Sequence, residues 1–252
     1  MSNKLFSIIT PVFNGATFIE ETIKSIITQS FRNFEYIIVD GGSTDGTKEI
    51  INRYSSNINK FISEKDEGMY DAIDKAIKMS TGKYILWVNS DDVLADNNSL
   101  ENVSLVLNKK SYKWITGRVS YIFRNNKKIF NFIPYVYPNF IINKGFAHDC
   151  FWGFIQQEST IFSRDLYFKA GGFDKKYKMA GDFNLWKKFS NYTKLYSCNI
   201  KIGAQRKWEG QMQKDLKYYY YEIGKKKCVF KFLKYLRLFY SIILLPYTYF
   251  RK

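Results

Sequence analysis

The 252-residue sequence contains little of what several kinds of site require: three cysteines, one histidine and no very long apolar run. Cys150, Cys198 and Cys228 are odd in number and widely spaced, which fits a reducing, cytosolic compartment better than a disulfide framework or a cysteine-bound metal. With His148 as the only histidine, a histidine-based metal site or a serine triad has little support. No stretch reaches the roughly 20 apolar residues of a spanning helix, and residues 5–13 resemble a first strand more than a signal peptide.

The charge of the chain is strongly unbalanced, with 39 basic against 23 acidic side chains and a formal net charge of +16. A field of this sign favours anionic partners such as nucleic acid, an acidic membrane face or phosphorylated substrates. The abundant aromatic residues keep a basic nucleic-acid-binding protein open as a non-enzymatic alternative. A hydrophobic content of 46% excludes a disordered chain.

The first part of the chain alternates between strand-like and helix-like patterns. Apolar runs at 5–13, 35–40, 60–64 and 84–89 are separated by segments with helical periodicity. Repeated strand–helix units predict a mostly parallel sheet with helices on both faces. After residue 95 the pattern changes: two strands are expected within 113–132, and a helix is expected at 180–189.

Polar or acidic residues follow each of the four expected strands. In parallel sheets ligands bind outside the carboxyl ends of the strands, so we expect these residues to line one edge, here called the acid rim. The acid rim consists of Thr10–Pro11, Asp40, Glu64–Asp66 and Asn89–Asp92.

The acid rim suggests a nucleotide bound without a phosphate-binding loop. The loop "GGSTDGT" after Asp40 lacks the lysine of such loops, so Asp40 is expected to accept hydrogen bonds from a uracil N–H or ribose hydroxyls. Asp91 and Asp92 offer hard oxygen ligands, suited to Mg²⁺ or Mn²⁺ bridging a diphosphate. From their position alone, Arg206 and Lys207 are further candidates to neutralise phosphates.

Four segments together carry a resemblance to a known family: "SIITPVFNGATFIEETIKSIITQSF", "YIIVDGGSTDGT", "SEKDEGMYDAIDKAIKMSTGKYILWVNSDD" and "GGFDKKYKMAGDFNLW". Over about residues 5–190, the chain closely resembles the family 2 glycosyltransferases, and most nearly the bacterial enzymes that assemble O-antigen, capsule or colanic acid. The resemblance implies a Rossmann-like GT-A fold, a nucleotide-sugar donor, Mg²⁺ or Mn²⁺, and inversion at the anomeric carbon.

The resemblance also implies a role for individual residues. Asp182, in "AGDFNLW", matches the catalytic base, and Asp91 and Asp92 match the metal-binding acids. The residues that match nucleotide-sugar-binding positions are Thr10, Pro11, Asp40, Glu64, Asp66, Asn89 and Asp91. Two departures stand out: Asn89 replaces an aspartate found in many members, and "QQEST" (156–160) replaces a His-Gln pair on the acceptor side. Without the resemblance, Asp182 could be a helix N-terminal acid, and Asp91–Asp92 could be a turn and helix cap.

These patterns divide the chain into a nucleotide-sugar-binding half (1–95), an acceptor-binding half of the same domain (96–205) and a basic, aromatic helical tail (206–252). The tail holds Lys225–Lys227, Lys231, Lys234 and Arg237 before a short apolar run. It is expected to dock on the cytoplasmic face of the membrane, although packing against the domain is the alternative.

The function expected from the whole sequence is inverting transfer of a sugar, with a UDP-sugar favoured over guanine or thymine donors. The acceptor would be a lipid-linked saccharide in bacterial surface polysaccharide biosynthesis. Transfer to a polyprenyl phosphate is the alternative enzymatic reading, because the nucleotide-binding half would look the same.

Overall fold

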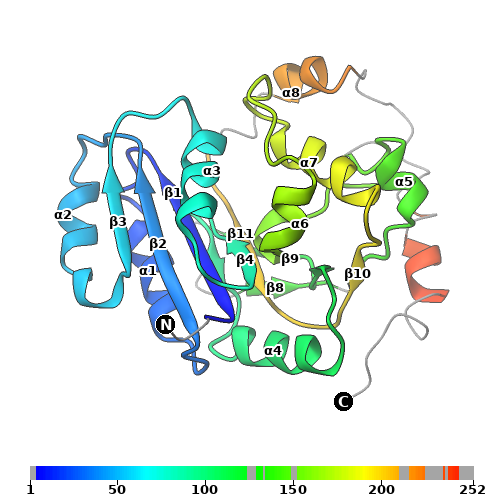
Figure 1. The fold of residues 1–252 in the computed structure, drawn as a ribbon, viewed down its shortest axis with the longest axis horizontal. Helices are drawn as coiled ribbons and strands as arrows, with labels where there is room; N and C mark the ends of the chain where they lie inside the picture. The colour runs from blue at the N-terminus through cyan, green and yellow to red at the C-terminus, as the bar shows by residue number, and fades with distance from the viewer. Residues whose placement is uncertain are drawn as a thin grey trace.

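The computed structural model describes residues 4–123, 129–132, 134–148, 152–209, 216–224, 235 and 238–243. Within these residues a seven-stranded sheet has the order β10-β6-β9-β4-β1-β2-β3, and a four-stranded sheet has the order β5-β11-β7-β8 (Figure 1). The strands are β1 (Phe6–Val12), β2 (Phe34–Asp40), β3 (Lys60–Ser63), β4 (Tyr84–Trp87), β5 (Val93–Leu94), β6 (Trp114–Thr116), β7 (Ser120–Phe123), β8 (Ile129–Asn131), β9 (Thr160–Ser163), β10 (Tyr196–Ser197) and β11 (Gly203–Lys207). The helices are α1 (Ile19–Ile27), α2 (Thr47–Asn52), α3 (Met69–Met79), α4 (Ser99–Lys109), α5 (Asn139–Asn143), α6 (Arg164–Lys169), α7 (Gly181–Ser190) and α8 (Leu216–Glu222), with 3₁₀ turns η1 (Ser55–Asn57) and η2 (Gln157–Ser159).

The repeated strand–helix units predicted for the first part of the chain are confirmed. β1 pairs in parallel with both β2 and β4, and β2 pairs in parallel with β3. Every residue of β1 is buried, as expected for a strand covered on both faces. The pairing places Val12 opposite Asp40, and Asp40 opposite Ser63. The carboxyl ends of these strands therefore meet at one edge, as the acid rim requires.

Helices cover both faces of the main sheet. Apolar side chains of α1 and α4 pack on one face, while α3, α5 and α7 pack on the other. On the second face Trp186 of α7 lies between Trp87 and Trp114, with ring centroids 5.8 and 5.4 Å apart. Stacked aromatic pairs stabilise beyond the area they bury, by about 0.5–1.5 kcal/mol each. This stack fixes α7 on the sheet, and the first turn of α7 carries Asp182.

The two expected halves of the domain share one sheet. β9 lies between β4 and β6 and is antiparallel to both. β11 pairs with β5 and β7, and it runs across the boundary expected at residues 205 and 206. Because β5 directly follows Asn89–Asp92, β11 brings a late segment of the chain beside the acid rim.

In the part of the chain that the structure describes, every helix is too short or too polar to cross a bilayer. The basic residues of the tail, Lys225–Lys227, Lys231, Lys234 and Arg237, lie outside the described residues.

Candidate functional site

Asp40, at the end of β2, is completely buried. Its Oδ2 accepts hydrogen bonds from Gly42 N (3.2 Å), Ser43 N (3.0 Å) and Ser63 Oγ (2.7 Å), and its Oδ1 accepts one from Ser43 Oγ. A carboxylate has about four acceptor sites, so these donors leave little capacity for a ligand. The contact with a base or ribose expected for Asp40 stays a prediction. In this structure Asp40 organises the loop that follows it.

β1 (Phe6–Val12) ends one residue before the end of the apolar run at 5–13, and so beyond Thr10 and Pro11. Thr10 and Pro11 are buried inside the sheet, and Thr10 Oγ1 is 3.1 Å from Tyr36 Oη. The nucleotide contacts expected for Thr10 and Pro11 stay a prediction. The residues that emerge at the rim are Phe13, whose side chain is 64% exposed, and Asn14, which has a positive φ of 49°.

The loops after β1 and β2 are tied together at the rim. Asn14 N donates to Ser43 Oγ at 2.7 Å, and Asn14 Oδ1 accepts from Thr44 N at 3.0 Å. Ala16 N donates to Asp45 Oδ2 at 3.0 Å. Because both loops are cross-linked by hydrogen bonds, the surface they present to a nucleotide is preorganised.

Glu64 and Asp66, in the loop after β3, differ in their surroundings. Glu64 is exposed and forms an ion pair with Lys75 at 2.8 Å. Asp66 lies against Gly41, where an added Cβ would be only 2.7 Å from Asp66 Oδ2. Asp66 Oδ1 also accepts from Gly68 N at 2.9 Å. Asp66 therefore lies at the rim beside the end of β2, whereas Glu64 lies farther out against α3.

The two aspartates after β4 point in different directions. Asp92 is 1% exposed, and its Oδ1 accepts from Arg206 N at 2.9 Å while its Oδ2 accepts from Asn89 Nδ2 at 3.3 Å. Burial, with the charges of Asp91 and Glu158, raises the pKa of Asp92 well above its usual range. Asp91 is partly exposed, and its Oδ2 accepts from Trp208 Nε1 at 2.8 Å.

This arrangement fits a divalent cation at Asp91 better than at Asp92. Asp92 is buried and both of its oxygens accept hydrogen bonds from the protein, whereas Asp91 is partly exposed. Among the described residues, no three histidine, cysteine or acidic side chains group closely enough to hold a metal by themselves. Mg²⁺ is usually bound by one or two carboxylates together with substrate phosphates, and Asp91 is placed to supply such a carboxylate.

Arg206 is buried beneath the rim and does not face it. Its Nε donates to Asp91 O at 2.8 Å, its Nη2 pairs with Glu21 Oε2 at 2.6 Å, and its guanidinium lies 4.6 Å from the Phe18 ring centroid. Arg206 thus holds the backbone of Asp91 in place and is not available to neutralise phosphates. Lys207 remains partly exposed at the end of β11.

Asp182 has the surroundings of a general base. Its Oδ1 accepts from Phe183 N at 2.7 Å and from Tyr70 Oη at 3.3 Å. Burial raises the pKa of Asp182 to about 6, although these two hydrogen bonds oppose the rise. A carboxylate whose pKa approaches the working pH accepts protons more effectively than an ordinary aspartate. Tyr70 Oη also donates to Met179 O at 3.1 Å, which fixes the tyrosine beside the base.

Glu158, in η2, is an acidic residue of the site that sequence reasoning did not select. It is 2% exposed, and burial, together with the charges of Asp91 and Asp182, raises its pKa to about 7, while Lys207 opposes the rise. The only signal in the sequence was the unusual "QQEST" segment (156–160). Asp91, Asp92 and Asp182 therefore all lie within electrostatic range of the Glu158 carboxyl.

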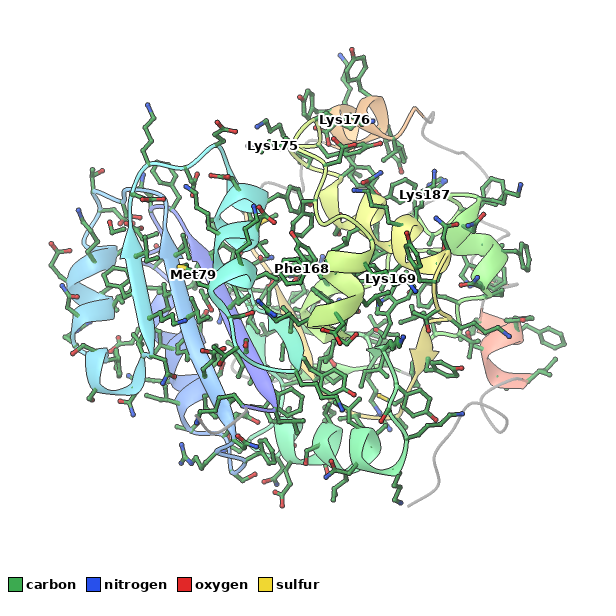
Figure 2. The ribbon with its side chains drawn as sticks, in the orientation of Figure 1. Met79, Phe168, Lys169, Lys175, Lys176 and Lys187 are labelled. Atoms are coloured by element: carbon green, nitrogen blue, oxygen red, sulfur yellow. The ribbon has the colours of Figure 1, made fainter. Side chains whose placement is uncertain are left out.

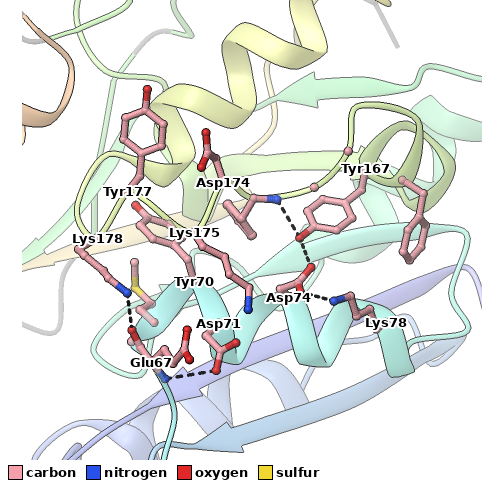
Figure 3. A pocket seen from close by; sticks show the side chains of 16 residues that line it. Glu67, Tyr70, Asp71, Asp74, Lys78, Tyr167, Asp174, Lys175, Tyr177 and Lys178 are labelled. Carbon is pink, nitrogen blue, oxygen red and sulfur yellow. Dashed lines mark hydrogen bonds and ion pairs between the residues drawn. The ribbon is translucent and has the colours of Figure 1, made fainter.

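A cavity of about 260 Å³ lies between α3 and the segment from α6 to Lys178 (Figure 3). The Tyr70 ring lines one wall, so the cavity lies next to the residue that contacts Asp182. Tyr167 Oη donates to Asp74 Oδ1 at 2.6 Å, and Lys178 Nζ donates to Glu67 O at 3.0 Å, which connects the two walls. Figure 2 shows several lysines around α6 and α7, namely Lys169, Lys175, Lys176 and Lys187. The lining of the cavity itself is mixed in charge, with the acids Glu67, Asp71, Asp74 and Asp174 beside Lys78, Lys175 and Lys178.

Solved structures share this fold at low sequence identity. The chain matches Staphylococcus aureus TarS 1–349 in complex with UDP-GlcNAc with a TM-score of 0.66 and 20% identity, covering 83% of this chain and 60% of TarS 1–349. It matches the mannosyltransferase PcManGT from Pyrobaculum calidifontis, in complex with GDP-Man and Mn²⁺, with a TM-score of 0.63 and 18% identity, covering 98% and 72%. These likenesses confirm the GT-A fold.

Curated relatives are glycosyltransferases, and the chain spans less than two thirds of the length of those that it matches here. An uncharacterized glycosyltransferase of Rickettsia prowazekii is 27% identical over 208 residues, which cover 76% of this chain and 60% of the relative. A PGL/p-HBAD biosynthesis glycosyltransferase of Mycobacterium bovis is 35% identical over 107 residues, covering 41% and 42%. The model of the family described as "Glycosyl transferase family 2" matches residues 7–170, which is well over half of the sequence. The chain therefore belongs to glycosyltransferase family 2.

Proposed function

We propose that this protein is an inverting glycosyltransferase that moves a sugar from a nucleotide-sugar, with UDP-sugars favoured, to a lipid-linked saccharide in bacterial surface polysaccharide or glycolipid biosynthesis. The observation that carries the proposal is the gathering of Asp91, Glu158 and Asp182 at one end of a GT-A sheet, with the Asp182 pKa raised to about 6 by burial. The family match and the nucleotide-sugar complexes of the structural neighbours support it.

The reaction requires a base on one side of the sugar and charge stabilisation on the other. Asp182 accepts the proton of the acceptor hydroxyl as its oxygen bonds to the anomeric carbon, and the bond from that carbon to the diphosphate oxygen breaks. Attack opposite the leaving group inverts the anomeric configuration. Asp91 would hold Mg²⁺ or Mn²⁺, which when bound supplies Lewis-acid stabilisation to the leaving diphosphate. Lys207, partly exposed near Asp91, adds positive charge on the same side.

We place the nucleotide against the loops after β1, β2 and β3. The exposed ring of Phe13, the backbone of Asn14 and the carboxylate of Asp66 are the groups available there, while Asn89 lies beside the diphosphate position. The cavity beside Tyr70 is on the side of Asp182, which supports approach of the acceptor from α3 and α6. Residues 1–95 then bind the nucleotide and diphosphate of the donor, while residues 96–205 supply the base and the acceptor side.

A metal-dependent thermal-shift measurement tests this function. We expect Mn²⁺ with a UDP-sugar to raise the melting temperature more than Mn²⁺ or the UDP-sugar alone, because ligands that bind only the folded state stabilise it. The same measurement with GDP- and dTDP-sugars tests which nucleotide base the protein prefers. Stabilisation by oligonucleotides and by none of the nucleotide-sugars would instead favour the nucleic-acid-binding alternative, which the clustered acids argue against.

The acceptor class is tested separately. Transfer of label from the donor to a polyprenyl phosphate, with none to a saccharide-bearing lipid, would replace our proposal with the alternative reaction. Transfer to the saccharide-bearing lipid supports the proposal as stated.

The helical residues near the chain end support a position on the cytoplasmic membrane face. Tyr240 packs against Trp152, with ring centroids 5.4 Å apart, and Ser241 Oγ accepts from Val136 N at 3.1 Å. The exposed apolar side chains recur at helical spacing on the other side: Tyr235, Leu238, Phe239, Ile242 and Ile243. One side of this segment therefore packs on the domain while an apolar side faces outward, which suits insertion into a lipid interface. The basic residues of the tail sequence would add attraction to anionic lipids of about 1 kcal/mol each.

Glutamates introduced at Phe239 and Ile242 should weaken binding to anionic vesicles at least about tenfold, since each apolar side chain loses about 1.5–3 kcal/mol of burial. Sedimentation with phosphatidylglycerol vesicles measures the effect. Leu105→Glu, at an exposed apolar position on α4, is the matched control and should bind as the parent protein does. Equal binding of the double variant and the control would rule out docking through this face.

A further inference from the structure

We propose that Glu158 binds hydroxyl groups of the transferred sugar and thereby contributes to the choice of donor. The inference rests on the proposed function and adds a sugar-recognition residue to it. Its starting point is a buried carboxyl group that takes no part in the proton transfer or metal binding described above.

Glu158 is held in place by the meeting of the two sheets. It lies in η2, immediately before β9, and its backbone packs against β11 so closely that a Cβ on Gly203 would lie 2.1 Å from Glu158 O. The next residue, Ser159, donates from Oγ to Gly203 O at 2.9 Å. The same strand β11 supplies the N–H of Arg206 to Asp92. The backbone of Glu158 is thus fixed beside the residues that follow β4.

Glu158 lies within electrostatic range of the acids on both sides of the proposed sugar position, and its backbone packs on β11, whose Arg206 N–H donates to Asp92. Asp91, on the diphosphate side, and Asp182, on the acceptor side, both act on the Glu158 carboxyl. In an in-line displacement the sugar carbon must lie between the leaving diphosphate and the attacking hydroxyl. A carboxyl within range of both groups therefore flanks the sugar and not the base of the nucleotide.

One oxygen of the Glu158 carboxyl also lacks a partner. Its Oε1 is enclosed and has no hydrogen-bond partner among the described residues. Leaving a buried polar atom unpaired is unfavourable, so the residue has a reason to accept a hydrogen bond from a ligand. An anionic ligand would be repelled by the neighbouring carboxyl groups. A sugar hydroxyl is neutral and can both donate and accept, so it can pair with either protonation state of Glu158.

Sugar binding at Oε1 requires neighbouring side chains to shift, because this atom is enclosed. Lys207 is a suitable one: it is partly exposed at the end of β11, its charge acts on Glu158, and its Nζ donates to Gln205 Oε1 at 2.6 Å. Gln205 and Lys207 are neighbours on one strand, so moving this contact leaves the sheet pairing unchanged.

The test compares how Glu158→Gln affects binding of UDP and of UDP-sugars. With Mn²⁺ present, calorimetry measures the dissociation constants of UDP, UDP-GlcNAc, UDP-Glc and UDP-Gal for the full chain. We expect UDP to bind the variant within about twofold of the parent protein, while the sugar that the parent prefers loses about tenfold or more in affinity relative to UDP. The differences among the dissociation constants of the three UDP-sugars should also become smaller. Glu101→Gln, which neutralises an exposed acid on α4, should change neither value.

Three results would overturn the inference: unchanged sugar binding in Glu158→Gln, an equal loss for UDP and UDP-sugars, or a parent protein that binds UDP-sugars no better than UDP. A melting temperature for the variant close to that of the parent excludes a folding defect as the cause. If the parent protein binds no nucleotide at all, the proposed function fails and this inference fails with it. If the parent binds nucleotide-sugars and Glu158→Gln binds them equally well, only the inference about Glu158 fails.

Discussion

Asp182→Asn is expected to reduce the rate of sugar transfer by about 10²–10⁴-fold, the usual contribution of a positioned general base. Asparagine has nearly the same shape, and its amide oxygen can still accept the hydrogen bonds from Phe183 N and Tyr70 Oη. It cannot take a proton from the acceptor. The dissociation constant of a UDP-sugar should therefore stay within about threefold while turnover falls.

The transfer rate of the parent protein should also fall as the pH decreases through about 6. Burial raises the pKa of Asp182 to about 6, so the reactive carboxylate is lost there and not near the ordinary value of 3.8. The Tyr70 hydrogen bond opposes this rise, and Tyr70→Phe should move the acidic limb to higher pH. Transfer of labelled sugar from donor to a lipid extract, measured between pH 5 and 8, would show both effects.

The stability of Asp182→Asn provides the control. A carboxyl whose pKa is raised on folding stabilises the folded state when it is protonated, and that contribution is lost as the pH rises from about 3.8 to about 6. At pH 8 the neutral asparagine should therefore be no less stable than the parent. Transfer within tenfold of the parent rate in a folded Asp182→Asn protein would contradict the assignment of the base.

Asp91→Asn is expected to weaken the Mn²⁺-dependent part of UDP binding by at least about 100-fold, whereas Asp92→Asn should change it by less than about threefold. Asp91 is the partly exposed member of the pair, while Asp92 accepts its hydrogen bonds from Arg206 N and Asn89 within the protein. An asparagine at position 92 has nearly the same shape, and its amide oxygen can still accept the hydrogen bond from Arg206 N. Calorimetric titration of UDP with and without Mn²⁺ separates the metal-dependent part from the rest.

Asp92→Ala makes the comparison sharper. It removes the acceptor of the Arg206 N–H and should lower the free energy of unfolding by about 1–3 kcal/mol, while the Mn²⁺ dependence of the folded fraction persists. If Asp92→Asn abolished the metal effect and Asp91→Asn did not, the assignment of the two residues would be reversed.

The arrangement of strands was predictable because it depends on local patterns. Apolar runs and helical spacing identified β1 to β4 and the parallel pairing that follows from them. The direction in which individual side chains point was harder to predict from the sequence. Asp40 follows a strand as a ligand-binding acid would, but donors from its own loop and from Ser63 on β3 turn it inward. Thr10 and Pro11 were expected at the rim because the family resemblance assigns them to nucleotide binding, yet β1 continues to Val12 and both residues are buried.

Glu158 and Arg206 show that contacts between segments far apart in the chain could not be predicted from the sequence. The pKa of Glu158 depends in part on charges from residues 91, 182 and 207, which are far from it in the chain. Arg206 looked like a phosphate ligand by position, but it is buried against Phe18 and Glu21 from the first helix region. Residue composition and spacing do not predict such contacts. The family resemblance located the acids of the site, and only tertiary packing separated those that face the rim from those beneath it.

The insertion of β9 between β4 and β6 limits how this enzyme could regulate access to its centre. A strand from the later half is hydrogen-bonded on both edges within the sheet that carries the donor side, so the two halves cannot hinge apart as separate bodies. Opening and closing must instead be confined to loops and side chains above a rigid platform. Replacing residues 1–95 with those of a relative would consequently disturb a shared sheet. A chimera that combines the donor specificity of one protein with the acceptor specificity of another should fold only where β4 and β9 are exchanged together.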